Sequence, residues 1–367
     1  MPTVAGAGMA GLVAAARLTE LGGAPVVLER GDRPGGSMLL SSGVVWRYSS
    51  YEDFRLECPD GNPTLQRLIQ ERLDGALDWL RAAGAPVQAD STGNPRTVGV
   101  RFEPAGVVAA LTRRVRPELR REPVGDERPL VLATGGYAAR LARERGLPLR
   151  AAPWSEGGGI EVARALGAAP AGDPAQFYAR LQPAAPAVVA PGDFVRAAQL
   201  YGALAHAVDE RGRAFFPGRP RWDETDLALA VSRLPGARAW LVVDGDALAR
   251  PVGGRTVAER MAVAEELGGE VRRATQLAGL GLGALTSPKL RTPPFAAVLV
   301  QPGVTHTYAG LAVDASARVL DAAGRPLDGV YAAGADVGGV FTGGYASGLA
   351  AALVLGLVAA ESAAAGL

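Results

Sequence analysis

Three glycines, Gly6, Gly8 and Gly11, have the spacing that holds the diphosphate of a dinucleotide. In this pattern the first glycine permits a tight turn, the second lets the backbone approach a diphosphate, and the third allows a helix to pack closely on a strand. Glu29 follows Gly11 by eighteen residues, where a carboxylate accepts hydrogen bonds from ribose hydroxyls. The pattern therefore predicts a dinucleotide site at the N-terminal end of a helix, where unpaired N–H groups attract the diphosphate.

Further glycines favour FAD over NAD as the dinucleotide. Gly35 and Gly36 follow shortly after Glu29, and a predicted strand near residue 330 runs into Gly334 and Asp336. The carboxylate of Asp336 is thereby predicted to bind hydroxyls of a ribityl chain. Two separated signatures that close on one site indicate a flavin, which is gripped along its whole length.

The hydrophobic pattern supplies the elements that must hold these residues. Strands predicted at 3–5 and 26–28 flank a predicted helix over 12–21, which makes the strand–helix–strand unit of a parallel sheet. Residues 64–83 have the periodicity of an amphipathic helix. An Ala- and Pro-rich stretch over 170–191 suggests a crossover into another unit, which continues to about residue 294. Other strands are expected at 129–136, 296–300, 311–313, 318–320 and 330–333, and a last helix at 349–362.

Composition excludes several classes of protein. The chain has 367 residues, of which 48% are hydrophobic, so it can bury a large core in one large or two domains. Its 38 basic residues, all arginine except Lys289, balance 37 acidic ones, which gives no electrostatic case for a nucleic-acid partner. Cys58 is the single cysteine, and there are two histidines. An intrachain disulfide is therefore excluded, and no metal site is predicted.

One uncharged stretch must be compared with a membrane-spanning segment. No charged residue occurs between Asp336 and Glu361, but the strongly apolar run, 349–360, is shorter than the roughly 20 residues that span a bilayer. The first residues also lack the basic start of a signal peptide. We expect a buried core helix, no membrane partner and a cytoplasmic protein.

Seven segments of the chain together resemble the fumarate reductase/succinate dehydrogenase flavoprotein family, in its soluble FAD-only branch. Residues 34–46 look most like the ketosteroid dehydrogenase branch, and residues 293–314 look more like the tricarballylate dehydrogenase branch. The resemblance is carried by residues 6–12, 26–30, 34–46, 130–137, 156–168, 293–314 and 329–356.

The resemblance implies an α/β fold: a Rossmann-like FAD-binding domain over 1–172 and 296–367, with a smaller inserted α+β capping domain over 173–295. It implies noncovalent FAD, because no histidine precedes His206 to form the usual covalent link. The residues predicted to line the cofactor are Gly6, Gly8, Met9, Ala10, Gly11, Glu29, Arg30, Gly35, Gly36, Ser37, Ser42, Gly43, Ala133, Thr134, Gly135, Gly334, Asp336, Ser347, Gly348 and Leu349.

Two residues are predicted to be catalytic through the resemblance. His306 begins a segment that resembles the HT-x-GG segment of fumarate reductases, in which the histidine contacts the substrate. Tyr345 stands where those enzymes have an arginine, and the ketosteroid and tricarballylate branches also have tyrosine there. A phenol can donate a hydrogen bond to a carbonyl oxygen and can act as an acid. The helix that begins near Leu349 is expected to point its N-terminus at the flavin.

The capping segment departs from the family pattern. Residues 209–216 resemble the N-x-x-G-x-R-F segment, but Ala214 replaces its arginine and Gly218 stands where a proton-relay glutamate is expected. We therefore expect the relay of fumarate reductases to be absent. Arg219 and Arg221 are candidates for binding an anion instead, although surface arginines are equally common. The residues predicted to contact the substrate are Arg221, Tyr308 and Trp46.

Family members oxidise or reduce a carbon–carbon bond next to an activating carbonyl or carboxyl group. We accordingly predict an FAD-dependent oxidoreductase of CH–CH groups, more a dehydrogenase than a reductase, with a small-molecule substrate and an unknown electron acceptor. Two alternatives stay within the family: a 3-ketosteroid-type 1,2-desaturase, favoured by a large apolar pocket, and a tricarboxylate-type dehydrogenase, favoured by converging arginines. An alternative of another class is a non-catalytic FAD-binding electron carrier or assembly partner.

Overall fold

The computed structural model describes residues 1–120, 124–125 and 127–366. The chain divides by its contacts into two units. The first comprises 1–141, 151–177 and 306–367, and the second comprises 142–150 and 178–305. The second unit overlaps the predicted capping domain, 173–295, but begins at 178 and includes 142–150. It extends to 305 because the strand that begins at Phe295 pairs with other strands of this unit.

The first unit is built on a six-stranded sheet with the order β17-β18-β7-β1-β2-β6. Strand β1 is parallel to both of its neighbours, with Thr3 opposite Val26 on one side and Leu130 on the other. Strand β17 is antiparallel and closes one edge. The Rossmann-like α/β fold predicted from the sequence is confirmed. The strands are β1 (Thr3–Ala5), β2 (Val26–Glu29), β6 (Glu118–Leu119), β7 (Leu130–Leu132), β17 (Arg318–Leu320) and β18 (Pro326–Ala332).

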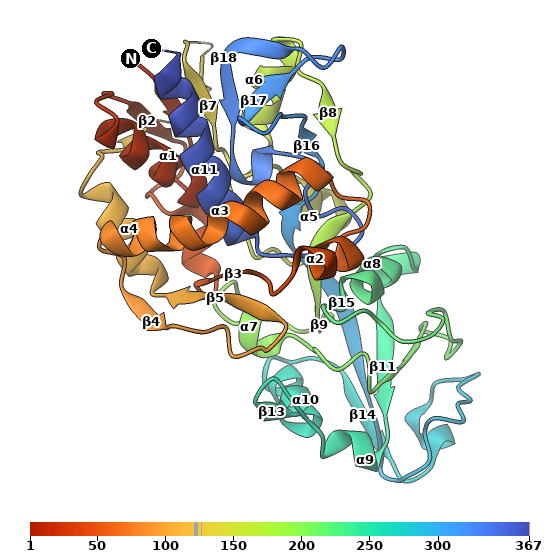
Figure 1. Cartoon of the computed structure of the whole chain (residues 1–367). Helices are drawn as coiled ribbons and strands as arrows, with labels where there is room; N and C mark the ends of the chain where they lie inside the picture. Colours follow the sequence, from red (N-terminus) through yellow and green to blue (C-terminus); the bar gives the residue numbers. More distant parts are fainter. Residues whose placement is uncertain (121–123, 126, 367) are drawn as a thin grey trace. The chain divides into compact units, whose positions relative to one another are not determined.

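Two helices from opposite ends of the sequence pack side by side on this sheet, α1 (Met9–Glu20) and α11 (Gly348–Ala365) (Figure 1). Their backbones approach closely at Gly356, where a Cβ would lie 2.8 Å from the carbonyl oxygen of Ala10. By length and composition α11 is apolar enough to cross a membrane, and 67% of its 18-residue window is buried inside the protein. Its apolar surface is thus largely used in packing against α1, β18 and β7.

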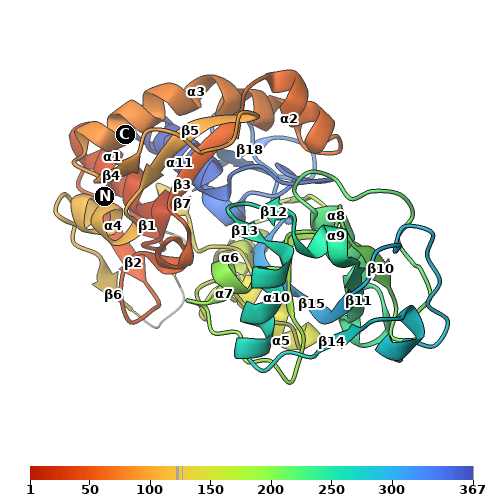
Figure 2. The ribbon, with the colours of Figure 1, turned by 90° about the horizontal axis from the view of Figure 1, so that it is seen from below.

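Helix α3 (Pro63–Ala82) lies along a small antiparallel sheet of β3 (Val44–Tyr48), β5 (Thr97–Phe102) and β4 (Val87–Ala89) (Figure 2). Asn62 caps the helix by accepting a hydrogen bond from the N–H of Thr64, and Pro63 stands at its first position. The remaining elements of the first unit are α2 (Tyr51–Glu57), α4 (Pro104–Thr112), α6 (Gly158–Ala165), β8 (Pro170–Ala171) and β16 (Gly310–Leu311), and α5 (Ala138–Arg145) begins in it.

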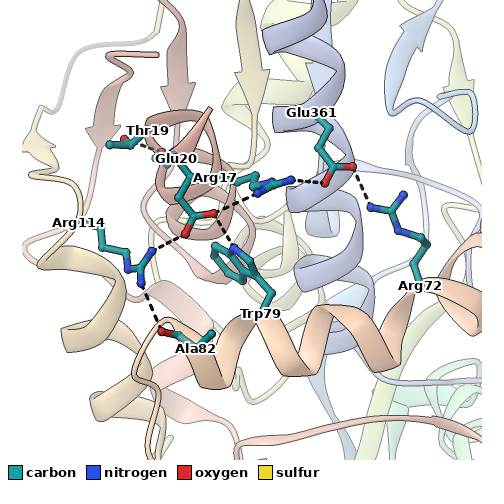
Figure 3. Close-up of polar contacts among 9 residues, drawn as sticks. Arg17, Thr19, Glu20, Arg72, Trp79, Ala82, Arg114 and Glu361 are labelled. Atoms are coloured by element: carbon teal, nitrogen blue, oxygen red, sulfur yellow. Dashed lines mark hydrogen bonds and ion pairs between the residues drawn. The ribbon is translucent and has the colours of Figure 1, made fainter. Parts of the chain in front are cut away.

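A chain of polar contacts ties three helices of this unit together (Figure 3). Glu361 of α11 accepts from Arg17 of α1 and from Arg72 of α3, at 3.3 and 2.8 Å. Glu20 at the end of α1 accepts from the indole N–H of Trp79 of α3, at 2.8 Å. The contacts are half-exposed, so their main effect is to fix which helix faces meet.

The second unit has a five-stranded sheet in which β15 (Phe295–Thr307) is central and antiparallel to both β11 (Ala239–Val243) and β14 (Val271–Ala274). Strand β9 (Phe177–Pro183) also pairs with β15, so the predicted crossover over 170–191 contains a strand. The other elements are β10 (His206–Val208), β12 (Pro251–Val252), β13 (Arg255–Thr256), α7 (Phe194–Ala197), α8 (Thr225–Ser232), α9 (Gly245–Leu248) and α10 (Val257–Glu266).

Candidate active site

The glycine motif forms a turn that only glycine can make. Gly6 has a φ of 102°, and a Cβ there would lie 2.2 Å from the carbonyl oxygen of Ala133. A Cβ on Gly11 would lie 1.8 Å from the carbonyl oxygen of Gly6. Both glycines are therefore required by the packing of α1 against β1 and β7.

Gly8 differs from its two neighbours in the motif, because a Cβ there would meet no atom within 4 Å. It is also the N-cap of α1, and within the described chain no side chain caps that helix. The first N–H groups of α1, those of Met9 and Ala10, thus lie at a helix end that borders open space. An uncapped N-terminus next to open space fits a diphosphate, which such N–H groups bind.

The second glycine pair lies against the first motif. The N–H of Gly35 donates to the carbonyl oxygen of Ala7 at 2.7 Å, and a Cβ on Gly36 would lie 3.4 Å from the Cα of Gly8. Both have positive φ, 112° and 51°, which favours glycine. The structure thus brings together the glycines that the sequence places about 28 residues apart.

Glu29 lies at the end of β2 and is only 4% exposed. Its carboxylate accepts from the N–H groups of Ala7 and Gly31, at 2.8 and 2.6 Å. Each carboxylate oxygen can accept more than one hydrogen bond, so a ribose hydroxyl remains a chemically suitable further donor. The following Arg30 is exposed, as is Ser42.

Trp154 is a residue of this region that the sequence reasoning missed. Its indole lies directly over Gly31, where a Cβ would be 2.3 Å from the ring. Gly31 in turn is held by the carboxylate of Glu29. An aromatic wall therefore stands beside the predicted ribose position, and nothing in the local sequence of Trp154 signals this contact.

The carboxylate of Asp336, which is predicted to contact a ribityl chain, has hydrogen-bond partners within the protein. Asp336 is fully buried, and its carboxylate accepts from the N–H groups of Thr134 and Gly136, at 2.6 and 2.8 Å, and from the hydroxyl of Thr134. Burial raises the pKa of Asp336, and these hydrogen bonds oppose that rise. Asp336 holds the loop that follows β7, which contains Thr134 and Gly135, and its contact with a ribityl chain stays a prediction.

Two predicted cofactor serines have structural partners. The hydroxyl of Ser347 accepts from the N–H of Ala350 at 3.2 Å and caps α11, and Ser347 is 2% exposed. The hydroxyl of Ser37 accepts from the N–H of Ala152 at 2.9 Å. Ser347 thus serves the helix that carries Gly348 and Leu349, which are themselves half-exposed. Of the remaining predicted glycines, Gly43 packs against Phe102 and Gly334 against Ala10.

Both predicted catalytic residues lie in one aromatic cluster of the first unit. Phe341 is at its centre, with its ring centroid 5.7 Å from that of His306 and 5.7 Å from that of Tyr345. Trp46 lies 6.3 Å from Tyr345, and Tyr308 lies 6.1 Å from His306. The structure therefore brings together four residues predicted for the reaction or the substrate, and adds Phe341, which the sequence reasoning missed. Tyr308 itself is 1% exposed.

Two hydrogen bonds fix Tyr345. Its phenol oxygen accepts from the N–H of Gly348 at 3.0 Å, and its carbonyl oxygen accepts from the phenol of Tyr48 at 2.8 Å. Gly348 is the first residue of α11, so the phenol oxygen lies at the positive end of a helix. A helix N-terminus favours negative charge that develops on or beside this oxygen.

His306 lies beside the same helix end, since a Cβ on Gly348 would be 3.0 Å from the imidazole carbon Cδ2. Burial lowers the pKa of His306 to about 4, so its imidazole is neutral at pH 7. Among the described residues, its Nδ1 has no hydrogen-bond partner, and neither do the hydroxyls of Thr307 and Thr342. Buried polar atoms without protein partners are expected where a ligand supplies the partner, so the residues present fit a bound cofactor and substrate.

Arg221 lies in the second unit, in the loop before α8, where its N–H donates to the carboxylate of Asp226 at 3.0 Å. Arg219 is exposed. A role for either in anion binding stays a prediction. Within the described residues there is no group of three or more His, Cys, Asp or Glu side chains that could hold a metal ion.

Comparisons with known proteins agree with this geometry. The FAD binding domain family matches residues 105–349, and an NAD(P)-binding Rossmann-like domain matches residues 4–49. The NADH:fumarate oxidoreductase of Klebsiella pneumoniae (strain 342) is 24% identical over 443 residues, which cover 98% of this chain and 47% of that protein. The chain thus spans about half the length of this curated relative.

Solved structures share the fold. A flavocytochrome c3 fumarate reductase in its open conformation superposes with a TM-score of 0.68 at 20% identity, over 100% of this chain and 78% of that one. A 3-ketosteroid-delta4-(5alpha)-dehydrogenase from Rhodococcus jostii RHA1 gives a TM-score of 0.73 at 19% identity. The match covers 99% of this chain and 96% of that one. Since the family match covers more than half of the sequence and includes the loop of Asp336 and Tyr345, this chain belongs to the FAD binding domain family, and its homologues include flavoproteins of the fumarate reductase/succinate dehydrogenase type.

Proposed function

We propose that the chain is an FAD-dependent oxidoreductase that acts on a CH–CH bond activated by a neighbouring carbonyl or carboxyl group, with dehydrogenation as the favoured direction. FAD, when bound, supplies the acceptor for the hydride. The observation that carries the proposal is the placement of His306 and Tyr345 together at the N-terminal end of α11. A shared oxygen of the substrate between these two donors would be polarised for loss of an adjacent proton.

The charge state of this pair supports an uncharged activating group. A neutral imidazole donates one hydrogen bond and adds no positive charge, because the pKa of His306 is lowered to about 4 by burial. Tyr345 stands where fumarate reductases of the family have an arginine. Holding a dianion without cationic partners is costly. We therefore propose a ketone, or an acid with at most one carboxylate, as the substrate.

Within that class, a 3-ketosteroid-type desaturase substrate is the second candidate. The aromatic rings of Trp46, Phe341 and Tyr345 around the two donors favour an apolar, ring-bearing ketone over a tricarboxylate. We also propose the cytoplasm as the compartment, since the first residues lack the basic start of a signal peptide.

Anaerobic flavin reduction tests the proposal. The FAD-loaded protein is mixed in parallel with a 3-ketosteroid, tricarballylate and succinate, and its reduced form is mixed with fumarate. We expect rapid bleaching by the ketone and little change with succinate or fumarate. Exclusive, fast turnover of fumarate would overturn the proposed substrate class. Bleaching by none of them, with reduction only by an artificial electron donor, would instead favour the electron carrier.

A further inference from the structure

A buried amide in the first unit holds the loop that carries Phe341 and Tyr345. Residues 339–347, which precede α11, form neither helix nor strand. Their position therefore depends on contacts with the rest of the unit rather than on regular backbone pairing. Gln66 of α3 is fully buried and supplies one such contact, because its Nε2 donates to the carbonyl oxygen of Val340 at 2.8 Å.

Both N–H bonds and the oxygen of the Gln66 amide have partners. Nε2 also donates to the carbonyl oxygen of Cys58 at 3.0 Å, and Oε1 accepts from the guanidinium of Arg55 at 2.6 Å. A guanidinium can only donate, so Arg55 determines which end of the amide is the oxygen and leaves the N–H bonds facing the two carbonyl groups. Arg55 therefore orients Gln66 toward Val340.

Arg55 is itself held by the turn between α2 and α3. Its guanidinium donates to the carbonyl oxygens of Pro59 and Gly61, at 2.5 and 2.7 Å. A Cβ on Gly61 would overlap both the Gln66 amide and the carbonyl oxygen of Val340. The turn, the amide and the loop are thus packed closely, with no room for a side chain at Gly61.

The anchored residue is next to the centre of the aromatic cluster. Val340 directly precedes Phe341, whose ring centroid lies 5.7 Å from those of both His306 and Tyr345. A shift of the Val340 backbone would therefore move the ring that packs against both predicted donors. In an active site, a misplacement of about 1 Å can lower the rate by about 10²-fold.

We propose that Gln66 is a positioning residue for the reaction: oriented by Arg55, it holds the loop at Val340 and thereby sets the places of Phe341 and Tyr345. Loss of the amide leaves buried carbonyl oxygens without their donors, which loosens the loop. The effect on the rate rests on the proposed function, whereas the anchoring of the loop does not.

Cys58 reports the anchoring without any substrate. It is the single cysteine, it is fully buried, and a Cβ on Gly344 of the loop would lie 3.5 Å from its sulfur. The rate at which an aromatic disulfide reagent modifies Cys58 in the FAD-loaded protein measures how often the turn and the loop separate. We expect this rate to rise about tenfold or more in Gln66→Met, which keeps the length of the side chain and removes its amide.

Gln199 offers a matched control in the second unit. It is also fully buried, its Nε2 donates to the carbonyl oxygens of Ala197 and Arg260 at 2.7 and 3.1 Å, and its Oε1 accepts from the phenol of Tyr201 at 2.8 Å. Gln199→Met loses the same kinds of hydrogen bonds. It should leave the reactivity of Cys58 within a factor of about two, because the two sites share no partner.

Gln66→Glu is a second, milder variant. Its carboxylate can still pair with Arg55, which favours folding, but it has no N–H to donate to Val340. The reactivity of Cys58 should rise in this variant as well. Unchanged reactivity in both Gln66 variants, or an equal rise in Gln199→Met, overturns the anchoring.

Anaerobic flavin reduction by a 3-ketosteroid tests the effect on the reaction. The limiting rate at saturating steroid should fall about tenfold or more in Gln66→Met, while the FAD affinity stays within a factor of about two. Arg55→Met should have a similar effect, and the double variant should be little slower than either single variant, because both residues act through one contact.

Each other outcome decides against one part of the proposal. A wild-type limiting rate in Gln66→Met overturns the positioning role and leaves the proposed oxidoreductase intact. Effects that add fully in the double variant overturn the role of Arg55. If the steroid does not reduce the wild-type flavin, the proposed substrate class fails, and the reactivity of Cys58 still decides whether Gln66 anchors the loop.

Discussion

The phenol oxygen of Tyr345 accepts the N–H of Gly348 at 3.0 Å, so the residue predicted to donate a proton is bound to the first residue of α11. A hydrogen bond to the oxygen stabilises the phenolate form more than the phenol, as does the positive end of the helix. The same hydrogen bond fixes the orientation of the ring. One contact thus ties the acidity and the position of Tyr345 to the start of a buried helix.

Removing this hydroxyl should slow the reaction and leave the cofactor in place. Tyr345→Phe is expected to lower the rate of flavin reduction by the true substrate by about 10²-fold or more, because it removes the acid. The FAD affinity should stay within a factor of about two, since the aromatic ring remains. Tyr51→Phe is the matched control, because its hydroxyl contacts only the backbone of Pro63 at an exposed position. An unchanged rate in Tyr345→Phe would show that the phenol moves no proton.

Substitutions at the second and third glycines of the dinucleotide motif should distinguish an effect on folding from an effect on FAD binding. Gly11→Ala places a Cβ against the carbonyl oxygen of Gly6 and should destabilise the fold by about 1–3 kcal/mol or more. Gly8→Ala meets open space, so the melting temperature of the FAD-free protein should hardly change. Its FAD affinity should nevertheless fall about tenfold or more, which is about 1.4 kcal/mol. If Gly8→Ala had the melting temperature and the FAD affinity of the wild type, the diphosphate would bind elsewhere.

Glu29→Ala should weaken FAD binding by about 10- to 100-fold, since charge-assisted hydrogen bonds contribute about 1.5–3 kcal/mol each. The substitution also frees the N–H groups of Ala7 and Gly31, so part of the loss reflects a looser turn. Flavin fluorescence titration measures the affinity, with Glu71→Ala on the exposed face of α3 as control. If binding were unchanged, the ribose would have another partner.

Stability should fall in mild acid because of His306. Its pKa is lowered from 6.5 to about 4 by burial, so the folded protein binds this proton more weakly than the unfolded chain does. The stabilising contribution is complete above pH 6.5 and is lost as the pH falls through this range toward 4. Denaturant unfolding of the FAD-free protein at several pH values should show a shallower drop for His306→Gln than for the wild type. Parallel curves would mean that His306 is accessible to protons in the folded state.

Heat or acid should release intact FAD from the purified yellow protein. The residues of the predicted cofactor segment include no histidine that could form the usual covalent link, since His206 is the first in the sequence. Chromatography of the supernatant after precipitation measures the released flavin. Flavin that remains with the denatured chain would contradict noncovalent binding.

The sequence predicted the parts of the fold that are encoded locally. Hydrophobic runs bounded by turn residues identified β1 and β17 at their observed bounds, and glycine spacing identified the turn before α1. The 13-residue length of β15 escaped prediction, because it depends on partners, β11 and β14, that are distant in sequence. The hydrophobic pattern of one strand does not show which distant strands pair with it.

The same limit applies to the side-chain partners at the site. A carboxylate after a strand can face a ligand or turn toward backbone N–H groups, and Asp336 does the second. Phe341 and Trp154 belong to no motif, so only the folded chain shows what their rings contact. The sequence predicts which chemistry is available more readily than it predicts which partner each side chain takes.

The packing of α1 against α11 has a consequence for biosynthesis. The helix that covers the buried face of α1 is made more than three hundred residues after the dinucleotide motif and α1. Throughout that interval the nascent chain exposes an alanine-rich apolar helix, which is the kind of surface that chaperones bind. The cofactor turn can therefore complete its packing only after α11 has been made.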